Sequence, residues 1–257
     1  LCVEKGLQVE IPPRAQVIRI LMAELTRLSS HQLWWGCTGL DLGAVTPFFY
    51  AFREREAVLA IMEETCGDCP NQNNCVMYDL HPNFQNRVKD VLKQIKSKYN
   101  EYDEILSGNV IFEQRTKGVG YLSPEDAVSF GCTGPTARGS GVSCDVRKWF
   151  PYDGYEKVQF KEILETGGDC YARYMVRMAE MKQSVYIIEQ LIDQIPEGEY
   201  QAKTKAVLKL PKGEFYQRVE TARGELGVYI VSEGAASPYR IKYRSPNFSN
   251  LSALSHM

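Results

Sequence analysis

The chain has 257 residues, of which 44% are hydrophobic and 24% are charged, and this balance is typical of a soluble protein with a packed core. Thirty Lys and Arg residues against 32 Asp and Glu residues give a net charge of −2, which excludes the basic surface needed to bind along a nucleic-acid backbone. Aromatic residues make up 11% of the chain, which excludes intrinsic disorder because they supply ample apolar surface to bury.

The stretch that comes closest to a membrane span runs from Leu28 to Phe52, and it carries Asp41 at its centre. We therefore predict a buried core segment there rather than a span. No basic segment followed by an apolar stretch opens the chain, so we expect no signal peptide. The sequence starts at Leu1 and stops at Met257, and we expect both ends to lie inside a longer protein.

Helical patterns dominate the first 200 residues. Pro12-Pro13 closes an extended N-terminal segment and opens an amphipathic helix, in which apolar residues recur at near-helical spacing over residues 18–35. Thr46-Pro47 is typical of a helix N-terminus, with threonine as the cap and proline in the first turn. We predict a helix over residues 48–64 that closes at Gly67.

Three further helices follow in chain order. Pro82 opens a helix whose apolar residues between positions 84 and 95 form one face. Ser123 is a helix cap followed by acidic residues, and it starts a short helix that ends near Phe130. The strongest helical pattern covers residues 171–195 and is stopped by a proline.

The last part of the sequence predicts strands. Residues 215–219 and 226–231 read as strands joined by a turn at 222–224, and residues 241–243 are a candidate third strand. We therefore predict a mainly α fold of the α+β class, with a small C-terminal antiparallel β region. We expect residues 1–210 to form a helical core and residues 211–257 to form a β-containing region packed on it.

Asp41 is the only charged residue between Arg27 and Arg53. A buried carboxylate needs a partner, or its pKa rises. Two interpretations stay open at this point, namely a functional acid and an aspartate that caps the turn at residues 40–43. His31 lies ten residues earlier and is more often a satisfied core histidine; it can partner Asp41 only if the chain folds back.

Eight cysteines are too few for a disulfide scaffold, and five show no metal-like spacing, which favours free thiols in a reducing compartment. Cys66 and Cys69 form a Cys-x-x-Cys pair followed by Cys75, a spacing that suits zinc or an iron–sulfur cluster. Three cysteines do not close a tetrahedral site, so a distant residue such as His81 would have to complete it. A metal site and a divergent loop both remain open.

Residues 131–141 form a glycine-rich segment that follows a helix. It lacks a Walker lysine and the glycine spacing of dinucleotide-binding loops, so a phosphate cradle is disfavoured. We predict a tight loop that holds Arg138 against a carboxylate or a partner subunit. No Gly-x-Ser-x-Gly motif or Cys/His pair indicates a hydrolase.

An ordered set of motifs resembles the D subunit of the NADH:quinone oxidoreductase family, the enzyme of respiratory complex I. The motifs are IPPRAQ (11–16), ELTR (24–27) with His31, LDLGA (40–44), TPF (46–48), FRERE (52–56), RTKGVG (115–120), TGP (133–135) with Arg138, DVRK (145–148), GELGVY (224–229), PYR (238–240) and RSP (244–246). The resemblance covers nearly the whole chain.

The resemblance implies a fold and a function. That family is similar to the large subunit of nickel–iron hydrogenases, so it implies a hydrogenase-like helical core in which the metal site has become a quinone chamber. It implies that this chain binds no cofactor itself, that quinone is the substrate, and that electrons come from a neighbouring iron–sulfur subunit. The partners would be other complex I subunits, and through them the membrane arm of this proton-translocating enzyme. The location would be peripheral, on the cytoplasmic side of the bacterial inner membrane or its organelle equivalent.

By the same resemblance, Asp41 lines the quinone cavity and orients a histidine of the chamber. The positions that match core or interface motifs of the family are His31, Arg138, Asp145 and Arg240. The family's quinone-headgroup histidine and tyrosine precede Leu1, and the segment between Cys66 and Tyr78 departs from the family pattern. The alternative function is a metal-binding or assembly protein built on the same scaffold, which would use the three cysteines at positions 66, 69 and 75.

Overall fold

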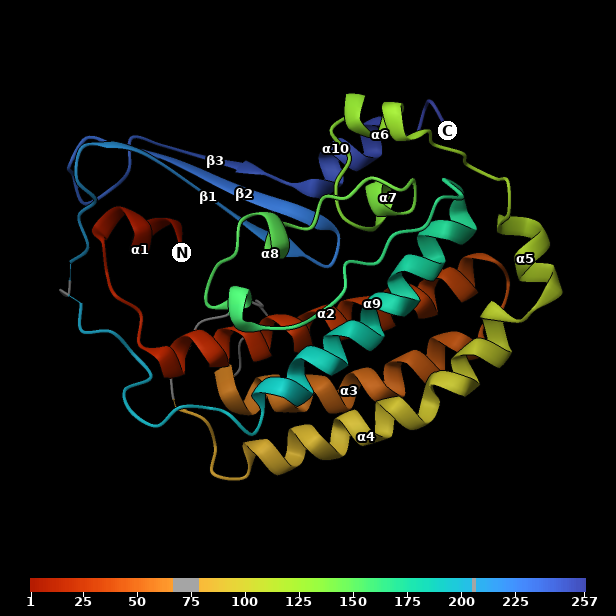
Figure 1. Ribbon diagram of the computed structural model, residues 1–257, viewed down its shortest axis with the longest axis horizontal. Coiled ribbons are helices and arrows are strands. Elements are labelled where there is room, and N and C mark those ends of the chain that lie inside the picture. The colour runs from red at the N-terminus through yellow and green to blue at the C-terminus, as the bar shows by residue number, and fades with distance from the viewer. Residues whose placement is uncertain (67–78, 205–206) are drawn as a thin grey trace.

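A computed structural model of the chain describes residues 1–66, 79–204 and 207–257. Its four long helices are α2 (Pro13–Asp41), α3 (Thr46–Cys66), α4 (Phe84–Tyr102) and α9 (Cys170–Leu191). They lie side by side as a bundle, in which α2 packs on both α3 and α9 while α3 packs on α4 (Figure 1). Helix α2 is therefore the centre of the bundle.

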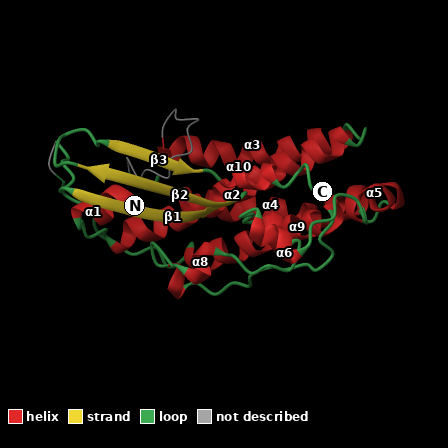
Figure 2. Ribbon diagram, turned by 90° about the horizontal axis from the view of Figure 1, so that it is seen from above, coloured by secondary structure: helices red, strands yellow, loops and turns green. Residues whose placement is uncertain are grey.

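Short elements and one sheet complete the fold. The short elements are α1 (Cys2–Leu7), η1 (Asp103–Ser107), α5 (Val110–Thr116), α6 (Pro124–Ser129), α7 (Pro135–Arg138), α8 (Val146–Trp149), η2 (Tyr155–Lys157) and α10 (Pro246–Ser252). Strands β1 (Gly213–Thr221), β2 (Gly224–Ser232) and β3 (Arg240–Arg244) form an antiparallel sheet in the order β1-β2-β3. The sheet extends to one side of the long helices (Figure 2).

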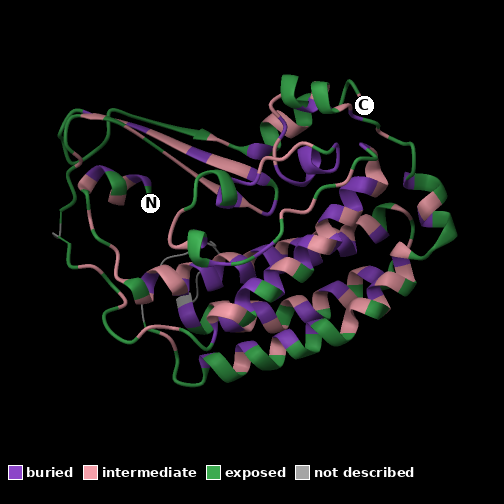
Figure 3. Cartoon of the chain, viewed as in Figure 1, coloured by how far each residue is buried: buried purple, intermediate pink, exposed green. Residues whose placement is uncertain are grey.

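The main hydrophobic core lies between the long helices. Helix α2 buries Leu21, Leu25, Leu28 and Trp35 completely, because α3 and α9 cover it from two sides. Helix α4, by contrast, is amphipathic and keeps an exposed outer face (Figure 3). In the part of the chain that the structure describes, no helix is both long enough and apolar enough to cross a membrane.

The predicted fold class is confirmed, since the protein is mainly helical with a small antiparallel sheet near its C-terminal end. Periodicity and capping located the helices well. The Ser123 hydroxyl caps α6 by accepting a hydrogen bond from the backbone N–H of Asp126, as the sequence predicted. The strands also form where they were expected, with Val219 opposite Leu226 across the hairpin.

Two boundaries were predicted wrongly. Residues 2–7 form helix α1 instead of an extended segment, because a six-residue helix is too short to show a periodic pattern and is held by tertiary packing against the sheet. Helix α9 ends at Leu191 rather than at residue 195. Pro196 restricts only residue 195, and the helix ends earlier because its bonding changes to a turn in which the Gln194 N–H donates to the carbonyl of Leu191 at 3.0 Å.

Candidate functional site

A cluster of charged side chains lies where the sheet meets the helical bundle, and we call it the buried charge cluster. Its members are Glu24, Arg27 and His31 of α2, Arg138 of α7, Asp145 and Arg147 around α8, Glu180 of α9 and Glu220 of β1. Each of these residues is at most 4% exposed. Charges buried to this degree require partners.

Arg138 connects α9 to the sheet. Its Nε and Nη2 atoms donate to Glu180 Oε1 at 3.0 and 2.6 Å, and its Nη1 atom donates to Glu220 Oε1 at 3.0 Å. Gly134 precedes its short helix with a φ of +68°, a conformation that favours glycine. Of the two alternatives for Arg138, a carboxylate or a partner subunit, the structure shows a pair of carboxylates.

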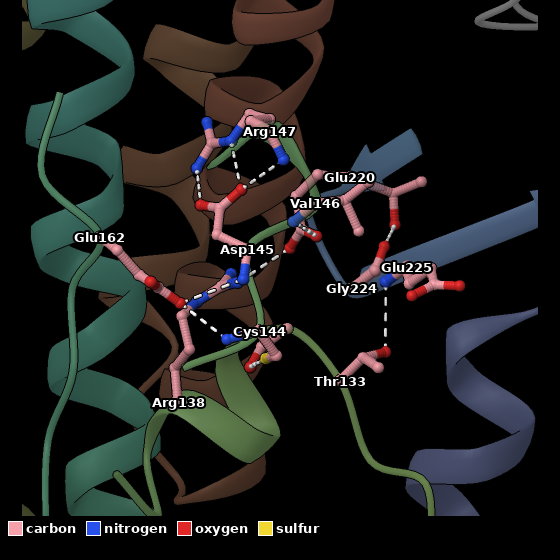
Figure 4. Close-up of polar contacts among 12 residues, drawn as sticks. Thr133, Arg138, Cys144, Asp145, Val146, Arg147, Glu162, Glu220, Gly224 and Glu225 are labelled. Carbon is pink, nitrogen blue, oxygen red and sulfur yellow. Dashed lines mark hydrogen bonds and ion pairs between the residues drawn. The ribbon is translucent and has the colours of Figure 1, made fainter. Parts of the chain in front are cut away.

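Asp145 and Arg147 form a second ion pair above the first (Figure 4). Arg147 Nε donates to Asp145 Oδ1 at 3.0 Å and Nη2 donates to Oδ2 at 2.7 Å, so the pair is bidentate. The Asp145 carboxylate also caps α8 by accepting from the backbone N–H of Arg147. Arg147 Nη1 then reaches Glu24 Oε1 at 2.9 Å, which links α8 to the central helix.

Glu24 is the most heavily bonded acid of the cluster. Besides Arg147, it accepts hydrogen bonds from Ser184 at 2.6 Å and from the Tyr155 hydroxyl at 2.7 Å, and it pairs with Arg27 at 3.2 Å. Burial alone would raise the pKa of Glu24, but Arg27, Arg147 and the two hydroxyl donors outweigh it and hold the pKa at about 2. Glu24 is therefore ionised throughout the physiological range.

Arg27 fastens the sheet to α2 through backbone carbonyls. Its Nη1 atom donates to the carbonyl of Thr221 at 2.8 Å and its Nη2 atom donates to the carbonyl of Glu220 at 2.9 Å. Burial raises the pKa of Glu220, and Arg138 opposes that rise. The cluster thus contains three arginines and four carboxylates. Among these acids, Glu220 is the one whose ionisation is least favoured.

His31 faces Glu180 from the central helix, with its Nε2 atom 2.9 Å from Glu180 Oε2. Burial lowers the pKa of His31, so the imidazole is neutral at pH 7 and its Nε2–H donates to the carboxylate. His31 does not partner Asp41. Both residues belong to the straight run of α2, and Asp41 is the last residue of that helix.

Asp41 stands apart from the buried charge cluster and is exposed, which contradicts the prediction of a buried segment around it. The reason is that α2 ends there and the chain reverses through Gly43, which has a φ of +90°. The Asp41 side chain has no hydrogen bond or ion pair with any described residue, so it does not cap the turn. The backbone N–H of Gly43, which donates to the carbonyl of Leu40 at 2.9 Å, closes the turn instead.

Exposed apolar side chains lie at the same α2–α3 turn as Asp41. Leu40 is 44% exposed, Val45 is 50% exposed and Phe49 is 65% exposed. Arg115 approaches from α5, and its Nη1 atom donates to the carbonyl of Leu42 at 2.9 Å. This end of the α2–α3 pair therefore presents one carboxylate together with exposed apolar side chains and Arg115.

The remaining predicted site residues lie elsewhere. Arg240 is exposed at the start of β3 and does not belong to the buried charge cluster. Cys69 and Cys75 lie outside the described residues, as does the side chain of Cys66, so the predicted metal site falls outside them too. Across residues 1–65, 79–204 and 207–257, no three potential ligands gather around one point. His81 accepts a hydrogen bond from the Asn83 N–H.

The sequence interpretation missed Glu180 and Glu220, which complete the cluster. A signal for both exists, because each is a charged residue inside an element predicted to be part of the core. Glu180 lies between Met178 and Met181, and Glu220 follows Val219 on a strand. A charge at such a position implies an oppositely charged partner from another element.

The chemistry of the buried charge cluster indicates a structural role. Its described members include no unpaired nucleophile, and its carboxylates are occupied by arginines, hydroxyls and backbone N–H groups. Glu162 adds to it by accepting from the backbone N–H groups of Cys144 and Asp145 at 2.8 and 3.0 Å. Of the predicted acids, Asp41 is the one that is accessible to a ligand.

Comparison with known proteins supplies the family context. A family model described as "Respiratory-chain NADH dehydrogenase, 49 Kd subunit" matches residues 41–210 and 204–257. The C/D subunit of NADH-quinone oxidoreductase from Bacteroides thetaiotaomicron is 50% identical over 99% of this chain and 49% of its own length.

Relatives that are D subunits alone are covered more fully. The D 2 subunit of NADH-quinone oxidoreductase from Solibacter usitatus is 46% identical over 100% of this chain and 70% of its own length. The D subunit of the same enzyme from Clostridium beijerinckii is 44% identical over 99% of this chain and 70% of its own length. The chain therefore spans about half the length of the C/D relatives and 70% of the length of these D relatives.

Proposed function

The chain belongs to the family of the respiratory-chain NADH dehydrogenase 49 kDa subunit, and from this membership we propose that it forms part of the quinone cavity of an NADH-quinone oxidoreductase. In the proposed reaction, an iron–sulfur partner subunit passes two electrons to the quinone, which takes up two protons and becomes a quinol. The chain acts only within the assembled complex. Its role is to form one wall of the quinone cavity and to couple the reduction of quinone to the proton-translocating membrane arm.

The observation that carries this proposal is the environment of Asp41. Its carboxylate is accessible at the α2–α3 turn, where Leu40, Val45 and Phe49 offer exposed apolar surface. A quinone has an apolar ring and tail and two carbonyl oxygens, so its site needs an apolar wall with few polar groups. Within such a wall, Asp41 would orient a histidine that hydrogen-bonds the headgroup.

The buried charge cluster supports this role from a distance. It fixes α8 and β1 on the central helix and α7 on α9 and β1, and α2 is the helix that ends at Asp41. A cavity wall must hold its position while the substrate enters and leaves. We accordingly propose that residues 1–210 form the helical core of the quinone module and that residues 211–257 form the β-containing region packed on it.

Substitution of Asp41 by asparagine in the assembled complex tests the proposed function. The change removes the charge and keeps the shape, so quinone reductase activity should fall by about tenfold or more, as expected when the charge that orients a proton-transferring group is lost. Assembly should persist, because Asp41 makes no contact that holds the fold. Asp90→Asn on the exposed face of α4 is the matched control. Wild-type activity in Asp41→Asn complexes would refute the role of Asp41.

The cofactor content of the chain is a separate part of the proposal. We propose that this chain binds no redox cofactor and that the cluster that reduces quinone belongs to a partner subunit. Metal analysis of the anaerobically purified chain, with its ultraviolet–visible spectrum, tests this. Iron or zinc near one per chain that disappears in a Cys69→Ser variant would instead support the alternative metal-binding function.

The proposed location follows from the partners. We propose that the chain reaches the membrane through other complex I subunits, as a peripheral protein on the cytoplasmic side of a bacterial inner membrane or its organelle equivalent. High salt or mild alkali should then release it from membranes while integral subunits stay behind. Retention after such a wash would contradict a peripheral position.

A further inference from the structure

Arg115 of α5 reaches across to the turn that carries Asp41. Helix α5 lies at the same end of the bundle as the α2–α3 turn (Figure 1). The Arg115 Nη1 atom donates to the carbonyl of Leu42 at 2.9 Å, although the two residues are 73 positions apart in sequence. This bond is therefore a tertiary contact between α5 and the residue that directly follows Asp41.

The turn itself does not supply a donor for the Leu42 carbonyl. The last carbonyls of a helix lack hydrogen-bond partners within that helix. At the end of α2, the backbone N–H groups of residues 42–44 donate to the carbonyls of residues 38–40 and so satisfy them. The Leu42 carbonyl receives no backbone N–H among the residues that the structure describes, and Arg115 is its hydrogen-bond donor.

The charge of Arg115 also suits this end of α2. The C-terminal end of a helix carries a partial negative charge, which favours cations and disfavours anions near the last turn. The last turn of this 29-residue helix contains Asp41 and no basic residue. In the described part of the chain, Arg115 has no carboxylate within ion-pair distance, and its one hydrogen bond is the one to Leu42. Arg115 therefore supplies the positive charge that the end of α2 lacks.

Helix α5 is anchored firmly enough to hold Arg115 in place. Its N-cap Asn109 accepts hydrogen bonds from two backbone N–H groups of the first turn, at 2.9 and 3.3 Å. Phe112 is only 4% exposed and packs on Tyr174 of α9, with 4.7 Å between the two ring centroids. Arg115 is thus carried by a fixed support, as a residue that positions another element must be.

We propose that Arg115 is a positioning residue for quinone reduction, which keeps the α2–α3 turn closed and thereby holds Asp41 in place at the wall of the quinone cavity. The inference rests on the proposed function, because it gives Arg115 a role in the reaction only through Asp41. Arg115 acts on the Leu42 carbonyl and on the end of α2, and not on the quinone itself.

Hydrogen-exchange mass spectrometry of the intact complex tests the contact without measuring activity. In an Arg115→Met variant, peptides that cover residues 40–46 should exchange about fivefold faster, as expected when one hydrogen bond that holds the turn is lost. Arg115→Lys keeps a charged donor and should keep exchange slow. Gln114→Met, which changes an exposed neighbour on α5, is the matched control. Unchanged exchange in the Arg115→Met complex would overturn the proposal.

A double-mutant cycle with Asp41→Asn tests the role of Arg115 in the reaction. Arg115→Met should lower quinone reductase activity by about fivefold when Asp41 is present, and by less than about twofold in the Asp41→Asn complex, because residues that act together give non-additive effects. Arg115→Lys should retain most of the activity. An equal fold-loss in the two backgrounds would show that Arg115 acts independently of Asp41, and would overturn the proposal.

The proposed function and the role of Arg115 fail in different ways. Wild-type activity in Asp41→Asn complexes refutes the proposed function, and the exchange measurement then still decides whether Arg115 closes the turn. Wild-type activity in Arg115→Met complexes, combined with a loss of activity in Asp41→Asn complexes, refutes the role of Arg115 alone. Assembly should persist in all of these variants, because both side chains are exposed.

Discussion

His31 and Glu180 face each other inside the protein, with 2.9 Å between the imidazole Nε2 and the carboxylate Oε2. Burial opposes ionisation of both groups, yet Arg138 and the hydrogen bond from His31 hold the pKa of Glu180 well below its usual range. The carboxylate is therefore charged and the imidazole is neutral. The other carboxylate oxygen, Oε1, takes both bonds from Arg138, so one acid ties α2 and α7 to α9.

The first prediction concerns Glu180. Substitution by glutamine leaves Arg138 with one remaining carboxylate, Glu220, in a site that excludes water. Breaking a buried ion pair from one side typically costs about 3–5 kcal/mol, because a buried charge loses its partner. Arg138 loses the acid that accepts two of its three bonds to carboxylates and keeps Glu220, so the lower end of this range applies. We expect the free energy of unfolding of Glu180→Gln to fall by about that amount, as measured by urea denaturation.

A matched control lies on the same helix. Glu189 of α9 pairs with Lys96 at 2.9 Å, but both side chains are more than 40% exposed. Surface ion pairs contribute about 0–1 kcal/mol, so Glu189→Gln should change the free energy of unfolding by less than about 1 kcal/mol. Similar losses for the two variants would show that the buried charge cluster does not stabilise the fold as we describe.

Much of the fold could be predicted from the sequence because its signals are local. Helix α4 shows its apolar face within 19 residues, and the Ser123 cap needs only the three residues that follow it. Helix α1 could not be predicted, since six residues give no periodicity and its stability comes from the sheet formed by residues after 210. The exposure of Asp41 could not be predicted either, because it depends on α2 ending at that residue.

The buried charge cluster was only partly predictable. The glycine-rich segment around Arg138 indicated a tight loop that holds this arginine. Its partners Glu180 and Glu220, however, lie 42 and 82 residues away in sequence. Nothing local indicates which arginine a buried glutamate will meet. A charged residue in a predicted core element predicts that a partner exists, and only the tertiary structure identifies it.

The second prediction concerns acid stability. Arg27 and Arg147 hold the pKa of Glu24 at about 2 against an ordinary value of 4.5, despite burial. Because the folded-state pKa is depressed, this group stabilises the fold fully above pH 4.5, and that stabilisation is lost as the pH falls from about 4.5 towards 2. The difference corresponds to about 3 kcal/mol for Glu24 alone. Asp145, with a pKa of about 2, should add to the effect.

Urea midpoints measured between pH 6 and pH 2 check this prediction. The wild-type midpoint should be flat near neutral pH and fall steeply below about pH 4.5. In a Glu24→Gln variant the midpoint should be lower at pH 6, and its decline below pH 4.5 should be shallower, since one titrating group has been removed. A decline with the same slope in both proteins would contradict the assignment of the depressed pKa to Glu24.

The third prediction concerns Gly134 at the junction of α7 and the hairpin. A Cβ atom at Gly134 would lie 2.5 Å from the Gly224 Cα, and the opposing Gly224 in turn packs on Thr133. Both the short contact and the backbone angles of Gly134, with φ +68° and ψ −151°, exclude a larger residue. Gly134→Ala should therefore push the hairpin away from α7.

Gly131→Ala separates the effect of the close contact from that of backbone conformation. Gly131 has a similar φ of +65°, but a Cβ there would meet nothing within 4 Å. Gly131→Ala should lower the free energy of unfolding by about 1 kcal/mol through backbone strain alone. Gly134→Ala should lower it by about 3 kcal/mol or more, since overpacking adds about 1–3 kcal/mol. Urea denaturation of the two variants measures the difference. Equal losses would mean that the hairpin shifts freely at this junction, and that the charges of Arg138 and Glu220 do not fix its position on the bundle.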